Sequence, residues 1–509
     1  TKPPMRSPIN YRAKSSTQPA RWTPFSGWKM AHPLLVFLAL LAWSIWIRGP
    51  FFGRDYIDKD ESTFVHMGTS WAEGHLPYTE LWDLKPPMTF AYFAGVVGLF
   101  GQHLWLIRLI GAALVAAVGY STYRLIRIHT RETTAQVLGA LTVALLSLFG
   151  SVQGVMSEHI ALFFWTPGVW ALIYSTLRST QYKTALIWCA GIMLSLSVAT
   201  KLNMAYAVLG LIVPWMISFR NPRQIIQLAL GGTVPVAVFA WLYRDHLELL
   251  WSSAVLASWA YTQLQKMQVP GLMAIVLWLL IPLVLWLFKP SHKAVKPSFW
   301  MIWGALAGVS FSIWSVGKLN GHYLLLVYPI WLCAMAWSFS GWSLKPMGNR
   351  ARLITAWGML LLPVESYLEA YRWGETLMQT GYATQGEGYE VARTLQNQGV
   401  EPQSVLWLEY HIGSWVMGGK PLSAASTHPS NIAREGLFPY FNPRKTSAAE
   451  LSYLLDTLSP KYIVTGPKPL FGQDHPQLQS QLDQTLQERY LVSETVGSAV
   501  IWAQRSPQS

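Results

Sequence analysis

The chain alternates long apolar stretches with short polar turns between about residue 33 and residue 367. Most of these stretches approach the length of about 20 residues that an α-helix needs to cross about 30 Å of hydrocarbon. The pattern therefore predicts an α-helical polytopic membrane protein with about eleven transmembrane helices. The predicted spans are 33–52, 104–123, 135–150, 160–177, 184–200, 204–219, 225–242, 271–288, 298–315, 323–340 and 353–368.

The charges between the spans predict their orientation. The N-terminal tail, residues 1–32, holds six basic residues and no acidic one: Lys2, Arg6, Arg12, Lys14, Arg21 and Lys29. Because Lys and Arg mark the cytoplasmic side of a membrane protein, we expect this tail to be cytoplasmic. A nucleic-acid-binding arm is the alternative, but the apolar span that follows at once favours topology as the explanation. Residues 33–52 are too long for a signal peptide and lack its cleavage site, so they are interpreted as a retained anchor.

A long outer loop follows the first span. The next strongly basic loop holds Arg124, Arg127 and Arg131, so only one crossing is allowed before it, at 104–123. The apolar segment 87–100 is about 14 residues long, which is typical of an interfacial or re-entrant helix. Residues 53–103 are therefore predicted to lie along the outer surface, between the first two spans.

The last part of the chain, residues 370–509, has ordinary polar sequence. Strand-like runs at 404–408, 462–465 and 499–503 alternate with helix-like stretches at 387–398, 448–458 and 477–490. Strands that alternate with helices predict a small α/β domain, which the odd number of spans places outside the cytoplasm. The expected organisation is a tail (1–32), a transmembrane domain (33–369) and an extracytoplasmic domain (370–509), with no internal repeat.

Composition agrees with a membrane protein. Hydrophobic residues make up 52% of the chain and charged residues 12%, whereas soluble proteins carry about 25% charged residues. The formal net charge is +13. The two cysteines, Cys189 and Cys333, fall in apolar spans and are expected to be inert packing residues rather than a disulfide or a zinc site.

The first outer loop is rich in carboxylates for a segment so close to a bilayer. It holds Asp55, Asp58, Asp60, Glu61, Glu73, Glu80 and Asp83. Acids that merely face water are the simplest explanation, but Asp60 and Glu61 open a helical pattern that would hold them on a packed element. The loop ends at Lys85-Pro86-Pro87, which predicts a cation beside the start of a helix. A lysine that only reaches towards the interface is the alternative.

Two motifs carry a resemblance to a known family. Asp60-Glu61, Phe64, Gly74, Pro77-Tyr78, Trp82-Asp83 and Lys85-Pro86-Pro87 resemble the first periplasmic loop of the lipid-linked glycosyltransferases of the C-type membrane fold. The resemblance is closest to the bacterial relatives of protein O-mannosyltransferases and of the lipid A aminoarabinose transferase. The segment from Gly317 to Tyr323, followed by Pro329, is similar to the outer His-Tyr motif of the same family.

This resemblance implies a reaction. Such enzymes move a sugar from a polyprenyl-phosphate carrier to an acceptor, with inversion at the anomeric carbon. A loop carboxylate can serve as general base for the acceptor hydroxyl, and cations can stabilise the departing phosphate. A lipid donor also explains why the chain has no glycine-rich nucleotide motif.

The resemblance also implies roles for individual residues. Asp60 matches the catalytic carboxylate and is the expected base, and Glu61 is its orienting neighbour. Lys85 is expected near the carrier phosphate. Glu158 matches a second acid that orients the acceptor, although an acid favoured by a helix N-terminus is an equal alternative.

Further residues are expected at the donor phosphate and the lipid entrance: Lys318, His322, Tyr323 and Lys201. Relatives often carry arginine near the position of Lys318, so its phosphate geometry is less defined. Lys201, between two spans, either binds phosphate or only reaches towards the interface. The segment 243–270 is expected to form an interfacial helix rather than a lid over the donor.

Other functions stay open at this point. A lipid or glycan transporter would place ionisable residues near the membrane midplane, whereas this chain gathers them in an outer loop. A binding or assembly subunit is a third alternative. No metal site is expected, although the carboxylates of the first loop leave a divalent cation open. The expected location is the bacterial inner membrane, and the sugar and the acceptor (glycan, lipid or protein) are not defined by the sequence. No nucleic-acid partner is expected.

Overall fold

A computed structural model describes residues 32–55, 57–177, 182–263, 269–288, 297–317, 319–340, 349–472 and 474–505. The predicted basic tail up to residue 31 and the predicted site residue Lys318 lie outside these ranges.

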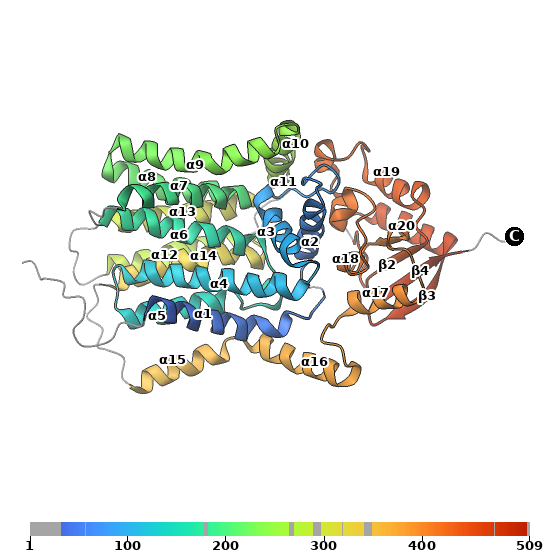
Figure 1. Ribbon diagram of the computed structural model, residues 1–509, viewed down its shortest axis with the longest axis horizontal. Helices are drawn as coiled ribbons and strands as arrows, with labels where there is room; N and C mark the ends of the chain where they lie inside the picture. Colours follow the sequence, from blue (N-terminus) through green and yellow to red (C-terminus); the bar gives the residue numbers. More distant parts are fainter. Residues whose placement is uncertain are drawn as a thin grey trace, which may run out of the picture.

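Long helices form one bundle, and their axes run roughly side by side (Figure 1). Seven of the helices within the described ranges are long and apolar enough to cross a membrane, among them α4 and α6. The helices of the bundle are α1 (Pro33–Arg48), α4 (Leu104–Arg127), α5 (Glu132–Leu145), α6 (Ser157–Leu177), α7 (Lys183–Thr200), α8 (Met204–Phe219), α9 (Pro222–Leu242), α12 (Val269–Leu287), α13 (Pro297–Val316), α14 (Leu324–Phe339) and α15 (Asn349–Leu361).

Small residues let some of these helices approach closely. A Cβ atom on Gly210 of α8 would overlap the carbonyl oxygen of Gly304 on α13. Such contacts are typical of helices that associate within a membrane, where close packing replaces the hydrophobic driving force. On the outside of the bundle, α9 exposes large apolar side chains such as Ile226, Val236 and Trp241, as expected for a surface that faces lipid.

The first ten predicted spans each fall on one helix, but the eleventh does not. Residues 353–368 are divided, because α15 ends at Leu361 and α16 (Val364–Thr380) begins after Pro363. Proline removes a backbone donor and restricts the residue before it, which explains the break. The helix α16 was not predicted, and eleven membrane crossings remain a prediction.

Shorter helices lie at the end of the bundle that faces the C-terminal part of the chain (Figure 1). They are α2 (Lys59–Ala72), α3 (Pro87–Phe100), α10 (Leu247–Trp251) and α11 (Ala257–Gln263), the last two joined by a π-helical turn, Ser252–Leu256. The segment 87–100 forms one helix, α3, as predicted, and most of 243–270 that is described is helical. Every residue of α2 from Glu61 to Ser70 is buried.

The C-terminal part contains a four-stranded sheet with strand order β1-β2-β4-β3. Its strands are β1 (Val405–Trp407), β2 (Tyr462–Thr465), β3 (Tyr490–Val496) and β4 (Ala499–Gln504). β1 pairs with β2 in parallel, whereas β4 is antiparallel to both β2 and β3. Helices α17 (Glu387–Asn397), α18 (Ile412–Val416), α19 (Ser447–Ser452) and α20 (Pro476–Arg489) surround it. The three predicted strands are confirmed, and β3 was missed.

The C-terminal part is joined near Arg54 to the segment between α1 and α2. The backbone of Asp55 donates to the carbonyl of Gln385, and Gln385 donates to the carbonyl of Gly53, both at 3.0 Å. Arg54 also forms an ion pair with Glu369 of α16, with an N–O distance of 2.7 Å. These contacts hold the sheet domain over the loop that carries the predicted site.

Candidate functional site

The start of α2 sets the directions of the two neighbouring acids, Asp60 and Glu61. Asp58 precedes the helix in an extended conformation, and its carboxylate accepts a hydrogen bond of 2.9 Å from the backbone N–H of Asp60. This is the usual N-cap arrangement, and acidic side chains in the first turn are favoured by the helix dipole. Successive helical residues point about 100° apart, so Asp60 and Glu61 face different surroundings.

The carboxylate of Asp60 lies between the side chains of a lysine and a histidine. Its Oδ2 is 3.3 Å from Nζ of Lys85, and its Oδ1 is 3.4 Å from Nε2 of His428. Burial alone would raise the pKa of Asp60, but Lys85 and His428 outweigh it and hold the pKa well below its usual range. Asp60 is therefore an anion at neutral pH, with each carboxylate oxygen in contact with a different partner.

Lys85 is held in place by the end of the first loop. Its backbone N–H donates to Oδ1 of Asp83 at 3.0 Å, and its carbonyl accepts from the hydroxyl of Tyr78 at 2.6 Å. The ammonium also lies 5.4 Å from the ring centre of Phe64, a cation–π contact. Burial would lower the pKa of Lys85, but the carboxylates of Asp60, Asp83 and Glu158 raise it above its ordinary value, so Lys85 stays charged.

Glu61 points away from Lys85 and into the bundle. Its Oε2 lies 2.6 Å from Nη2 of Arg108 on α4, and its Oε1 accepts from the backbone N–H of Val155 at 2.8 Å. Both partners of the ion pair are fully buried. Arg108 also donates to the backbone carbonyls of Phe51 and Arg54. The pair thus joins α2, α4 and the start of the first loop.

Asp58 is a further carboxyl group beside Asp60. Burial and the negative charge of Asp60 raise the pKa of Asp58 to about 7. The pKa values of the two neighbouring carboxyl groups are thus shifted in opposite directions, that of Asp60 down and that of Asp58 up. Such divergence is common at catalytic sites, although structural networks produce it too.

A second charged cluster is formed by α6, α7 and the start of α14. Glu158, in the first turn of α6, lies 2.9 Å from Nζ of Lys201 and 4.0 Å from Nε2 of His322. Lys201 caps the end of α7, and its ammonium is 4.8 Å from the ring centre of Tyr323. Glu158 and Tyr323 both help to raise the pKa of Lys85, so the two clusters are close enough to interact electrostatically.

The structure therefore brings together six of the predicted residues: Asp60, Lys85, Glu158, Lys201, His322 and Tyr323. Glu61 lies next to this group in the chain but is bonded to Arg108. Sequence reasoning missed Arg108 and His428. Arg108 could have been noticed as a charged residue within an apolar span, which is rare without a role, whereas no local pattern marks His428.

The C-terminal domain covers the site from the side opposite the bundle. The hydroxyl of Thr63 donates to the carbonyl of Thr427 at 3.2 Å, the indole N–H of Trp415 donates to Thr69 at 2.8 Å, and Lys59 pairs with Glu409 at 2.9 Å. These contacts lie along α2 and account for the burial of its polar side chains.

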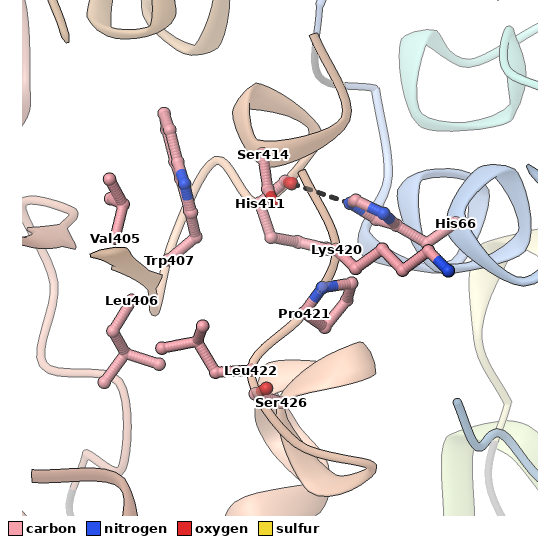
Figure 2. A pocket seen from close by; sticks show the side chains of 10 residues that line it. All are labelled: His66, Val405, Leu406, Trp407, His411, Ser414, Lys420, Pro421, Leu422 and Ser426. Carbon is pink, nitrogen blue, oxygen red and sulfur yellow. Dashed lines mark hydrogen bonds between the residues drawn. The ribbon is translucent and has the colours of Figure 1, made fainter. Parts of the chain in front are cut away.

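A small cavity of about 10 Å³ lies in this interface, with His66 of α2 on one side and His411 on the other (Figure 2). Their rings stack with 6.2 Å between centres, and Nε2 of His66 lies 3.0 Å from the carbonyl oxygen of His411. Burial lowers the pKa of His66 to about 4, and burial followed by the charges of nearby histidines lowers the pKa of His411 well below its usual value. Both are neutral at pH 7, because a buried imidazolium without a counter-ion would be costly.

The donor set of the site offers little to a divalent cation. Within the described ranges, no three His, Cys, Asp or Glu side chains gather in a way that could hold a metal ion. At Asp60 the space beside the carboxylate is occupied by the ammonium of Lys85.

Comparison with solved structures defines the fold. The structure aligns with apo ArnT from Cupriavidus metallidurans at a TM-score of 0.61 and 15% identity, over 93% of this chain and 99% of that one. It aligns with the same protein bound to undecaprenyl phosphate at a TM-score of 0.56 and 14% identity, over the same shares. No family model matches the sequence, and no curated protein does.

The chain therefore has the same fold as ArnT, and it is a multi-pass membrane protein. The resemblance seen in the first loop is confirmed at the level of this fold.

Proposed function

We propose that the protein is an inverting glycosyltransferase that moves a hexosyl or pentosyl group from a polyprenyl-phosphate carrier to an acceptor hydroxyl or phosphate. One observation carries the proposal: a largely buried carboxylate, Asp60, lies 3.3 Å from a largely buried ammonium, Lys85, beside a second cluster that contains Lys201. A base and two cations within one site are what this reaction requires.

The chemical step assigns one role to each group. An acceptor oxygen attacks the anomeric carbon from the side opposite the phosphate, and its proton passes to the carboxylate of Asp60. The bond between the anomeric carbon and the phosphate oxygen breaks, and the electron pair leaves with the phosphate monoester. The second pKa of that phosphate monoester is about 6, so it departs without a strong general acid. It does need cations beside it to stabilise the negative charge that develops. Lys85 and Lys201 supply them.

The ion pair between Lys85 and Asp60 links donor binding to catalysis. A carrier phosphate that binds Lys85 competes with Asp60 for the ammonium. As Lys85 shifts to the phosphate, Asp60 loses part of the interaction that keeps its pKa low, and its carboxylate becomes a better base. The base is then most effective when the donor is in place.

The remaining predicted residues have supporting roles in this proposal. Glu61 orients the start of α2 through its pair with Arg108. Glu158 orients Lys201 and the acceptor, and His322 and Tyr323 line the passage of the phosphate and its lipid. Lys318 precedes them in the chain and is proposed as a further phosphate contact.

The proposal includes an orientation and a location. The basic tail, residues 1–32, is cytoplasmic, the transmembrane domain spans 33–369, and the domain formed by 370–509 lies outside the cytoplasm with the site, in a bacterial inner membrane. The similar protein ArnT has a structure bound to undecaprenyl phosphate, and this supports a lipid carrier of that class.

The direct test uses the purified full chain in lipid nanodiscs with polyprenyl-phosphate sugars that carry a radiolabel in the sugar. We expect wild-type protein to release free polyprenyl phosphate and to transfer label to an acceptor fraction. Movement of intact labelled donor across a vesicle membrane without any release of polyprenyl phosphate would instead support a transporter and contradict the proposal.

A further inference from the structure

His428 is the one side chain of the C-terminal domain that the described structure places in an ion-pair contact with Asp60. Its Nε2 lies 3.4 Å from Oδ1 of Asp60, and only 7% of the imidazole is exposed. It therefore contacts the carboxylate oxygen that Lys85 does not, and it reaches the start of α2 from a different part of the chain.

The backbone on both sides of His428 is fixed against the first outer loop and the sheet domain. Thr427, just before it, accepts from Thr63 through its carbonyl and from the backbone N–H of Trp82 through its hydroxyl, at 3.2 and 3.4 Å. Pro429, just after it, holds His428 in an extended conformation and begins a short 3₁₀ helix.

The turn before His428 is held from inside the domain as well. Ser423 donates to the buried carboxylate of Glu450 at 2.8 Å, and Ser426 donates to the carbonyl of Ser423 at 3.0 Å. The imidazole is thus positioned by contacts on two sides, and its other ring nitrogen, Nδ1, is buried with no hydrogen-bond partner among the described residues. Nε2 is the atom through which this side chain interacts, and its target is Asp60.

Contacts on both carboxylate oxygens of Asp60 fix its orientation better than one contact alone. A carboxylate held only by Lys85 could rotate about its side-chain bonds, and it would lose its partner when a carrier phosphate draws Lys85 away. A second contact on Oδ1 keeps the carboxylate plane in the same direction during that exchange, so that Oδ2 faces the acceptor proton. Alignment of this kind matters because a small misplacement of a reacting group can slow a reaction strongly.

We propose that His428 is a positioning residue for Asp60, and that the C-terminal domain completes the site through it. This inference rests on the proposed glycosyl transfer. It assigns to the domain a part in the chemical step in addition to any recognition of the acceptor.

The test compares three variants of the full chain in nanodiscs. His428→Ala should lower kcat about 10- to 100-fold, the factor that a hydrogen bond to a charged group is worth, with little change in KM for the donor. His428→Gln, which keeps a donor, should recover much of the loss. Trp415→Phe removes an interface contact, the hydrogen bond from the indole N–H to Thr69, but leaves the imidazole and its backbone, and it should keep most of the activity. Equal losses in Trp415→Phe and His428→Ala would overturn the inference, because domain docking alone would then explain both.

A second measurement is independent of catalysis. Infrared titration of the Asp60 carboxyl, identified by difference from Asp60→Asn, should show a higher pKa of Asp60 in His428→Ala than in wild-type protein, and no such rise in Trp415→Phe. If the pKa of Asp60 is the same in His428→Ala as in wild-type protein, the contact between His428 and Asp60 is contradicted, whether or not the protein transfers sugar. Absence of transfer by wild-type protein, with the expected infrared result, would remove the proposed function and leave the contact intact.

Discussion

Nζ of Lys85 and Oδ2 of Asp60 lie 3.3 Å apart and join the start of α2 to the residues that directly precede α3. The lysine stands just before α3 and the aspartate opens α2, so this ion pair also fixes how the two helices meet. Both side chains are largely buried between the helical bundle and the C-terminal domain. A largely buried pair of this kind is costly to maintain for stability alone, which agrees with the role proposed for it in donor binding and catalysis.

Replacement of Asp60 by Asn should separate chemistry from binding. Asn keeps the size of the side chain but cannot take the acceptor proton, so kcat should fall about 100- to 10,000-fold. Donor binding should be retained or become tighter, because the carboxylate no longer competes with the carrier phosphate for Lys85. The measurement is release of polyprenyl phosphate at matched protein levels. The matched control is Asp245→Asn, because Asp245 is exposed and lies outside the site. Transfer at a normal rate by Asp60→Asn would remove Asp60 from the role of base.

Replacement of Lys85 by Met should weaken donor binding. The ammonium is the group expected to contact the carrier phosphate, so the affinity for undecaprenyl phosphate should fall about 10- to 100-fold. Fluorescence or calorimetric binding in detergent would measure it. Lys420→Met serves as control, since Lys420 pairs with Glu73 and Glu80 at the surface. If Lys85→Met binds the lipid as tightly as Lys420→Met and wild-type protein do, Lys85 does not contact the carrier phosphate.

Replacement of Arg108 by Met should destabilise the protein. It leaves the carboxylate of Glu61 buried without its cation, and loss of one partner of a buried pair costs about 3–5 kcal/mol of unfolding free energy. Denaturant unfolding in micelles would measure the change, with the exposed Arg244→Met as control. Adding Glu61→Met to Arg108→Met should restore part of the stability. A single variant as stable as wild-type protein would show that the pair does not hold α2 in place.

Stability should fall in mild acid because of His66. Its folded-state pKa of about 4 lies below the ordinary value of 6.5, so the unfolded chain takes up the proton first. The resulting loss of unfolding free energy is absent above pH 6.5 and grows as the pH falls towards about 4, where it reaches about 3 kcal/mol. His411 acts in the same direction, whereas Asp58, with its raised pKa, acts in the opposite one.

The measurement that isolates His66 is the difference in melting temperature between wild-type protein and His66→Gln as a function of pH. Gln can still donate to the carbonyl of His411 but does not titrate. The variant should lose less stability than wild-type protein between pH 6.5 and 4. Parallel curves would show that His66 does not stay neutral in the folded interface.

The sequence predicts most of the fold because the main signals are local. Apolar stretches of sufficient length predict the bundle helices, and Lys85-Pro86-Pro87 predicts the start of α3. The strand β3 was missed because its residues from Leu491 to Thr495 are exposed and show no alternation of buried and exposed positions. The helix α16 was missed because the predicted span 353–368 was carried across Pro363 and took in the first residues of that helix.

Only the site residues that lie in the recognised motifs could be predicted from the sequence. Asp60, Lys85 and Glu158 were found because the resemblance marks them. The partners of these residues are tertiary contacts between distant segments: Arg108 joins Glu61 from α4, and His428 reaches Asp60 from the C-terminal domain. Periodicity and spacing carry no information about such pairs, so the local sequence could not assign them.

The most direct test of the account is a cryo-EM map of the full chain with undecaprenyl phosphate bound. We predict that the phosphate lies at the end of the bundle covered by the C-terminal domain, within hydrogen-bonding distance of Lys85, and that the ammonium has moved from Asp60 towards it. A phosphate bound at the opposite end of the bundle, or one that leaves the pair of Lys85 and Asp60 unchanged, would contradict the account.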